Sequence, residues 1–256
     1  MIEGRLQDDF EAAVRLDVVP GGVGFVADLP PSFSLAPTAF EPETGNAHGG
    51  LIAALAAKAA RQALALEAPL RTLSLQFLSG ARFGAITLEA ELTRGGRSTS
   101  FAGVRGRQAG AVFEARLTFG DDGDGPVYRP PTRPEAPDPE TAQAFPPAPG
   151  FLPRFTSHAD YRPLVGRPLS GAEPRLLLWI RENSAAPLDV IRLCFLLDAI
   201  FPAFYVMVDR VVPSASVDLR YDFAGAITPE DAPDGWILCE FATRELAAGW
   251  AIEDGT

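Results

Sequence analysis

Apolar and polar residues alternate with a period of two in several segments of the first half of the chain, namely residues 72–77, 86–93 and 111–119. This period places the apolar side chains on one face of a strand, as in an antiparallel sheet that is covered on one side. Residues 23–27 and 99–107 are predicted as two further strands. The first half is therefore expected to be rich in antiparallel sheet.

Residues 51–66 follow a different pattern, because they are rich in alanine and have a helical period. Ile52, Leu55 and Ala59 fall on one stripe of such a helix, whereas Lys58 lies away from it. One helix among several antiparallel strands predicts a sheet that wraps around the helix.

The second half of the chain repeats this order of elements. The predicted elements are a strand at 175–181, a helix at 189–207, a strand at 217–223 and two strands at 236–243 and 244–252. Pro202 is expected to end or kink the helix, because proline lacks the amide hydrogen that a helix interior needs. The repeat predicts two similar halves that form one body.

The repeat is incomplete in the sequence. No segment after Thr256 corresponds to the strand at 111–119. We therefore expect the last strand of the second half to be absent or to come from another chain. An unfinished sheet edge favours pairing with another chain, so we expect a homo-oligomer.

Prolines mark the boundary between the two halves, since ten of the 24 prolines lie between Pro126 and Pro153. Such a stretch cannot supply the amide hydrogens of a helix or a central strand, so it is interpreted as an extended linker or wrapping segment. The expected units are an N-terminal unit at 1–120, a proline-rich linker at 121–170 and a C-terminal unit at 171–256.

The charge balance narrows the choice of partner. The formal net charge is −11, which is a poor match for nucleic acid or for an anionic membrane surface. The longest apolar run, residues 190–208, contains Arg192 and Asp198 and so predicts no membrane span. The chain opens without an apolar leader, and a cytoplasmic location is expected.

Cysteine and histidine are scarce, with two of each in the sequence. Their spacing fits no zinc site and leaves little scope for disulfides, so we expect a reducing compartment and no metal. No cofactor is expected either. The glycine motif at residues 22–27 continues into Pro30 and Pro31 and not into a helix, which argues against a dinucleotide site.

Two residues in the second half are candidates for acid–base chemistry. Asp198 lies within an apolar helix, where an unpaired carboxylate would have a raised pKa. Ser216 follows on the polar face of a strand, where its hydroxyl could hold a water molecule against Asp198. The alternatives are a solvated or capping aspartate and an ordinary strand serine.

His48, Gly49 and Gly50 lie at the start of the first predicted helix. The free N–H groups of a helix N-terminus favour an oxyanion or a carbonyl oxygen, and His48 would orient that ligand. The alternative is a tight turn that needs glycine for packing.

Four stretches, residues 48–55, 75–78, 92–99 and 215–219, resemble the type II acyl-CoA thioesterases. The resemblance implies an α+β fold called a double hotdog, in which two long helices are each wrapped by an antiparallel sheet. It also implies that an aspartate, a hydroxyl and a glutamine hold the attacking water. Asp198 and Ser216 match the first two, whereas the strand that carries the glutamine would follow Thr256.

The function expected from this resemblance is hydrolysis of acyl-CoA by a water that Asp198 activates. The acyl chain would lie in an apolar tunnel lined by Leu55, Phe77 and Phe195. One alternative is a non-catalytic acyl-CoA-binding hotdog protein, which the absent glutamine favours. Another is an enoyl-CoA hydratase, which would need His48 to approach Asp198 across the two halves.

Overall fold

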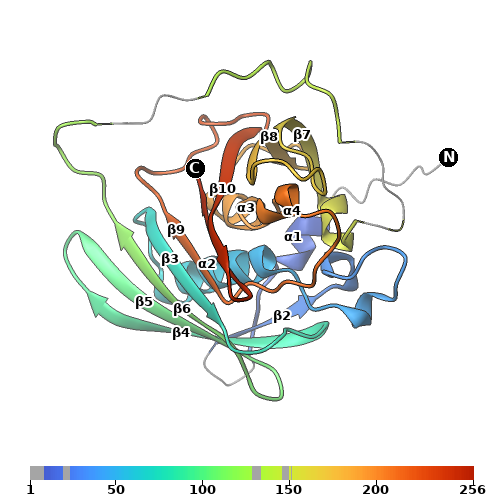
Figure 1. Ribbon diagram of the computed structural model, residues 1–256. Helices are drawn as coiled ribbons and strands as arrows, with labels where there is room; N and C mark the ends of the chain where they lie inside the picture. Colours follow the sequence, from blue (N-terminus) through green and yellow to red (C-terminus); the bar gives the residue numbers. More distant parts are fainter. Residues whose placement is uncertain (1–8, 20–23, 129–133, 146–149, 151) are drawn as a thin grey trace.

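The computed structural model describes residues 9–19, 24–128, 134–145, 150 and 152–256. Its strands form two antiparallel sheets. The long helix α2 packs on the first sheet, the short helix α3 packs on the second, and the two helices pack on each other (Figure 1). The helices therefore lie in the interior between the sheets.

The first sheet has the strand order β1-β2-β4-β5-β6-β3-β9. Its strands are Asp17–Val18 (β1), Phe25–Leu29 (β2), Leu70–Phe77 (β3), Gly84–Gly95 (β4), Thr99–Arg107 (β5), Ala111–Gly120 (β6) and Asp218–Asp222 (β9). The second sheet has the order β11-β10-β8-β7. Its strands are Ala159–Val165 (β7), Arg175–Glu182 (β8), Ile237–Ala247 (β10) and Trp250–Gly255 (β11).

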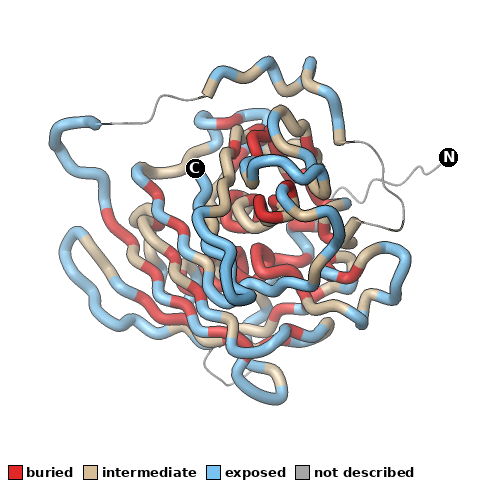
Figure 2. The backbone as a smooth tube through the Cα atoms, viewed as in Figure 1, coloured by how far each residue is buried: buried red, intermediate tan, exposed pale blue. Residues whose placement is uncertain are grey.

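The helices are Asp9–Ala13 (α1), Gly49–Leu64 (α2), Val190–Leu196 (α3) and Phe204–Met207 (α4), with short 3₁₀ turns at Pro31–Phe33, Pro42–Thr44 and Arg154–His158. Helix α2 is buried on nearly all sides as far as Ala60, and Lys58 is its first partly exposed residue (Figure 2). Its many alanines allow this burial, because small side chains let a helix approach both a sheet and another helix closely.

Strands β3 and β9 pair across the boundary between the two halves, and we call this pairing the seam. The amide of Phe77 donates to the carbonyl of Val217 at one end, and the amide of Phe223 donates to that of Arg71 at the other. Phe223 lies 146 positions after Phe77, and Val217 lies 146 positions after Arg71. The two bonds therefore exchange under a pseudo-twofold axis through the seam.

The second helix is shorter than the prediction of one helix over 189–207. Helix α3 ends at Leu196, and α4 begins only at Phe204. Pro202 cannot donate to a helical ladder, and the chain leaves the α-helix before it, with the amide of Asp198 bonded to the carbonyl of Phe195. The single long second helix was therefore wrong, and Asp198 lies just after α3.

The strands predicted at 236–243 and 244–252 also have different bounds. Strand β10 continues to Ala247, and the hairpin turns at Ala248 and Gly249, which both have positive φ. The pairing of β10 with β11 shifts register between Thr243 and Glu245. A bulge, and not a turn, therefore lies where the sequence suggested a boundary.

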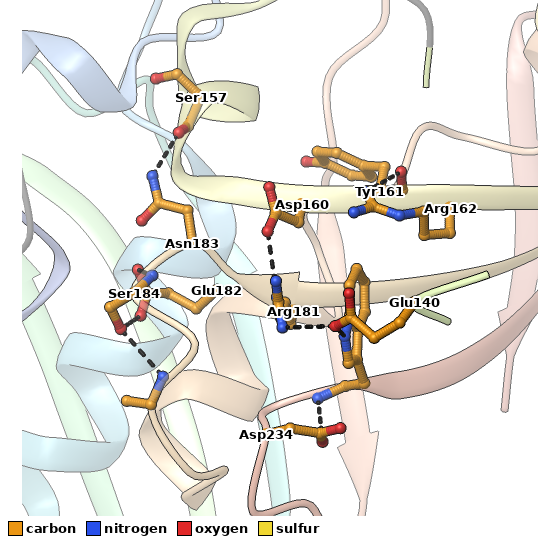
Figure 3. A network of polar contacts seen from close by, with 12 residues as sticks. Glu140, Ser157, Asp160, Tyr161, Arg162, Arg181, Glu182, Asn183, Ser184 and Asp234 are labelled. Atoms are coloured by element: carbon orange, nitrogen blue, oxygen red, sulfur yellow. Dashed lines mark hydrogen bonds and ion pairs between the residues drawn. The ribbon is translucent and has the colours of Figure 1, made fainter. Parts of the chain in front are cut away.

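Residues 134–145 of the proline-rich segment lie on the outer side of the second sheet. The Trp179 indole donates to the carbonyl of Pro137 at 2.9 Å, and the Trp236 indole donates to Glu140 at 2.9 Å. Figure 3 shows Glu140 meeting Arg181, which also binds Asp160 on β7. Polar contacts thus fasten the described part of this segment to β7 and β8.

Candidate active site

The start of α2 and the end of α3 meet at a buried histidine. His48 precedes α2, and its side chain is 1% exposed. Its Nε2 lies 2.9 Å from the backbone carbonyl oxygen of Asp198. A carbonyl oxygen can only accept, so Nε2 carries the proton and donates it, while Nδ1 is unprotonated. The imidazole therefore links the first half of the chain to the second.

Asp198 presents its carboxyl group to the same place. Its Oδ2 lies 3.4 Å from Nε2 of His48, and the amide of Gly50 donates a hydrogen bond to the carboxyl. The Asp198 side chain is 16% exposed, whereas His48 is almost completely enclosed. Part of the Asp198 side chain is therefore open to solvent, whereas the imidazole is not.

Burial determines the charge of both groups. Loss of hydration raises the pKa of Asp198 to about 7, although the hydrogen bond from Gly50 favours the charged form and opposes this rise. Burial lowers the pKa of His48 to about 4. His48 is therefore neutral at pH 7, and its contact with Asp198 is not an ion pair. A carboxyl group with a pKa near 7 is suited to accept a proton from water.

Gly49 and Gly50 permit the close approach of α2 and α3. A Cβ atom at Gly49 would lie 2.7 Å from Oδ2 of Asp198 and 2.8 Å from the ring of Phe77. A Cβ atom at Gly50 would lie 2.5 Å from the carbonyl oxygen of Phe195. Packing thus requires glycine here, and the same positions offer amides of the first helical turn, which lack acceptors within the helix.

Ser216 lies outside the strand on which the sequence pattern placed it. It is exposed and precedes β9, which begins at Asp218. Among the described residues no hydrogen bond joins it to Asp198. Its neighbour Val217 accepts the amide of Phe77, whose ring adjoins Gly49. The structure thus brings His48, Gly49, Gly50 and Asp198 together. Ser216 lies outside this group, beside the residue that bonds to Phe77.

Tyr221 belongs to this region, although the sequence analysis did not single it out. It faces inward from β9 opposite Leu73, and its buried hydroxyl has no hydrogen-bond partner among the described residues. Burial and the charge of Asp198 both raise the pKa of Tyr221, so the hydroxyl stays protonated. The sequence could have indicated Tyr221, because it is a residue with a hydroxyl group at an inward position of a strand whose other inward positions are apolar.

The residues expected to line an acyl tunnel differ in exposure. Leu55 and Phe195 are completely buried in the core, whereas Phe77 is half-buried beside Gly49. Within the described ranges, no cluster of three or more histidine, cysteine or acidic side chains is placed to hold a metal ion. No helix in the described part of the chain is long and apolar enough to cross a membrane.

Two family models match the chain. The acyl-CoA thioesterase N-terminal domain matches residues 38–120, and the acyl-CoA thioesterase C-terminal domain matches residues 130–256. Together they cover well over half of the sequence. A search of the curated proteins finds no match.

Solved structures have the same fold. A conserved hot dog fold protein of unknown function from Alicyclobacillus acidocaldarius is 23% identical, with a TM-score of 0.84 over 96% of this chain and 90% of its own. A tesB protein from Mycobacterium avium is 22% identical, with a TM-score of 0.74 over 97% and 91%. The acyl-CoA thioesterase II TesB2 from Mycobacterium marinum is 19% identical, with a TM-score of 0.70 over 96% and 90%. The expected double hotdog is confirmed.

Proposed function

Because this chain belongs to the acyl-CoA thioesterase family, we propose that Asp198 is the base that activates water for attack on the thioester of acyl-CoA. One observation carries this proposal. The Asp198 side chain is partly exposed, the pKa of its carboxyl is about 7, and the amide of Gly50 holds this carboxyl against the start of α2. A base with such a pKa is ionised in part at neutral pH and is still basic enough to take a proton.

The proposed reaction conserves atoms and charge in two steps. The Asp198 carboxylate takes a proton from water while the water oxygen bonds to the thioester carbon, which gives a tetrahedral oxyanion. The carbon–sulfur bond then breaks, the carbonyl re-forms, and the proton on Asp198 passes to the CoA sulfur. The products are a free carboxylic acid and CoA.

The amides at the start of α2 have separate roles in this proposal. The amide of Gly50 already donates to Asp198 and so orients the base. The amide of Gly49, one residue earlier in the first turn, is proposed to donate to the oxyanion, which the positive end of the helix dipole also favours. His48 acts on Asp198 through its backbone carbonyl and does not touch the substrate.

Release of CoA from acyl-CoA thioesters of different chain lengths, followed with a thiol reagent, tests the function. We also propose that the exposed Ser216 hydroxyl holds the attacking water when substrate is bound. Wild type is then expected to release CoA, and Ser216→Ala is expected to lower kcat about tenfold, because this hydrogen bond to water is lost. Ser98→Ala, which changes another exposed serine outside the strands and helices, is the matched control. Equal rates for Ser216→Ala and wild type would exclude Ser216 from the reaction.

The pKa of Asp198 predicts how the rate depends on pH. Because the ionised carboxylate is the base, kcat/KM is expected to rise with pH, to reach half of its maximum near pH 7 and to level off above it. Initial rates between pH 5 and 9 measure this profile. A rate that is constant over this range would mean that a group with a different pKa controls the reaction.

The enoyl-CoA hydratase alternative needs His48 to act on substrate beside Asp198. The two side chains do meet, with Nε2 of His48 3.4 Å from Oδ2 of Asp198. The imidazole, however, is 1% exposed and directs its proton to a backbone carbonyl. The geometry therefore favours hydrolysis over hydration.

A further inference from the structure

The pseudo-twofold axis of the seam relates the candidate active site to a second place in the same molecule. By the offset of 146 positions, Ser216 corresponds to Leu70. In the helices the offset is 141 positions, because His48 directly precedes α2 and Asp189 directly precedes α3. Leu70 and Asp189 both line a cavity of about 440 Å³. The cavity is therefore the symmetry mate of the candidate active site.

A lysine lies beside the position that corresponds to Asp198 in this mate. Asp198 lies eight positions after the first residue of α3, and the same count from the first residue of α2 gives Ala57, which Lys58 follows. Lys58 lines the cavity, as does Arg61 one turn further along α2. The mate thus has alanine where the active site has Asp198 and leucine where it has Ser216, and two cations of α2 lie in its lining.

The charges that line the cavity fall into two groups. Arg192 is held by Asp189 and by Glu11, and its Nε also lies 3.7 Å from Glu182, so these acids fully compensate its positive charge. Among the described residues no acid forms an ion pair with Lys58 or Arg61, and Arg61 lies 5.8 Å from the ring centre of Phe119. Glu67 is an exposed acid in the lining. Lys58 and Arg61 are therefore left to bind an anion.

The rest of the lining is apolar, with side chains from four parts of the fold: Phe10, Val14, Leu70, Val190, Ile191 and Ile227. A pocket that combines cations with apolar walls fits a ligand that has a charged head and a hydrocarbon chain. Inorganic phosphate would leave the apolar walls without a partner, and a neutral hydrocarbon would leave the two cations unpaired.

We propose that this cavity binds the carboxylate of a free fatty acid at Lys58 and Arg61, with the alkyl chain against its apolar walls. Such an acid is the class of product that the proposed function releases. The inference rests on the proposed function only where it identifies the ligand as that product. The acid would be held without reaction, because a carboxylate is not a thioester and has no leaving group. The site would allow the product to bind at a distance from the point where it is formed.

Lys58 is the only lysine in the sequence, which makes a direct test possible on the unaltered protein. An amine-specific acylating reagent should modify Lys58, and peptide mass mapping separates this product from modification of the N-terminal amine. Dodecanoate is expected to slow the modification of Lys58 at least tenfold and to leave the N-terminal rate unchanged. Dodecanol has the alkyl chain without the negative charge, and inorganic phosphate has the negative charge without the chain. Each should protect Lys58 at least tenfold less than dodecanoate does. Equal modification rates with and without dodecanoate would overturn the proposal.

Calorimetric titration with dodecanoate gives a second measurement. The double variant Lys58→Met with Arg61→Met is expected to bind about 10- to 100-fold more weakly than wild type, because charge-assisted hydrogen bonds are lost. Arg94→Met removes an exposed charge elsewhere and should bind as wild type does. Unchanged affinity in the double variant would overturn the site. If the protein binds dodecanoate but does not hydrolyse thioesters, only the proposed function is contradicted. If it hydrolyses thioesters but does not bind dodecanoate here, only the second site is contradicted.

Discussion

Replacing Asp198 with asparagine is expected to lower kcat for thioester hydrolysis by about 10²–10⁴-fold, the range of general acid–base catalysis. Asparagine keeps an oxygen that can accept the amide of Gly50, so the geometry at the start of α2 should persist while the base is lost. Release of CoA under saturating substrate measures the effect. Asp218→Asn, which changes an exposed carboxylate on β9, is the matched control and should retain the wild-type rate.

The same variant is expected to be more stable than wild type at alkaline pH. Folding raises the pKa of Asp198 from 3.8 to about 7, so between these values the unfolded chain binds fewer protons than the folded one. The free energy of unfolding of wild type therefore falls as the pH rises through this window. Asp198→Asn should recover up to about 4 kcal/mol at pH 8 and nothing near pH 4.

Denaturant unfolding of both proteins at the two pH values measures this difference. A variant that is inactive and also less stable than wild type at pH 8 would contradict the assignment, because it would mean that the carboxylate stabilises the fold. A variant that hydrolyses acyl-CoA at the wild-type rate would show that Asp198 is not the base. The expected combination of lost activity and gained stability is typical of a residue that is retained for its chemistry.

Gly50→Ala is expected to lower kcat as Asp198→Asn does, but to make the protein less stable and not more stable. The added methyl group would lie 2.5 Å from the carbonyl oxygen of Phe195 and 3.1 Å from Cβ of Asp198. Backbone cannot swing away as a flexible side chain can, so α2 and α3 must separate, which lowers the free energy of unfolding by about 1–3 kcal/mol. The separation also withdraws the Gly50 amide from Asp198, and kcat should fall at least tenfold.

Thermal unfolding and CoA release by Gly50→Ala test the two parts of this prediction. Gly110→Ala is the matched control, since a Cβ atom there has no neighbour within 4 Å and should change neither quantity. Wild-type stability and rate in Gly50→Ala would mean that the helices do not approach as closely as described.

Local patterns were sufficient to predict much of the fold. The strand predicted at 99–107 coincides with β5, and the alternation at 111–119 predicted β6 to within one residue. These segments bury one face only, so their period is visible in the sequence. The acyl-CoA thioesterase family, suggested by four short stretches, was confirmed.

Long-range packing accounts for what the sequence could not predict. The helix at 189–207 looked continuous, because its apolar residues continue past the point where the chain leaves α3 to place Asp198 beside Gly50. The contact of His48 with Asp198 joins residues 150 positions apart and depends on the approach of two helices. No periodicity within either segment records that approach.

The pseudo-twofold axis has a consequence for how this chain can vary. In a symmetric homodimer every substitution occurs twice, once in each of two identical sites. Here the two related sites are encoded by separate codons, and a change in one leaves the other intact. Asp198 is related to Ala57, which Lys58 follows, so one site carries an acid where its mate has a neutral residue beside a cation, which no pair of identical subunits could achieve. Joining both units in one polypeptide thus allows one site to keep a function while its mate diverges.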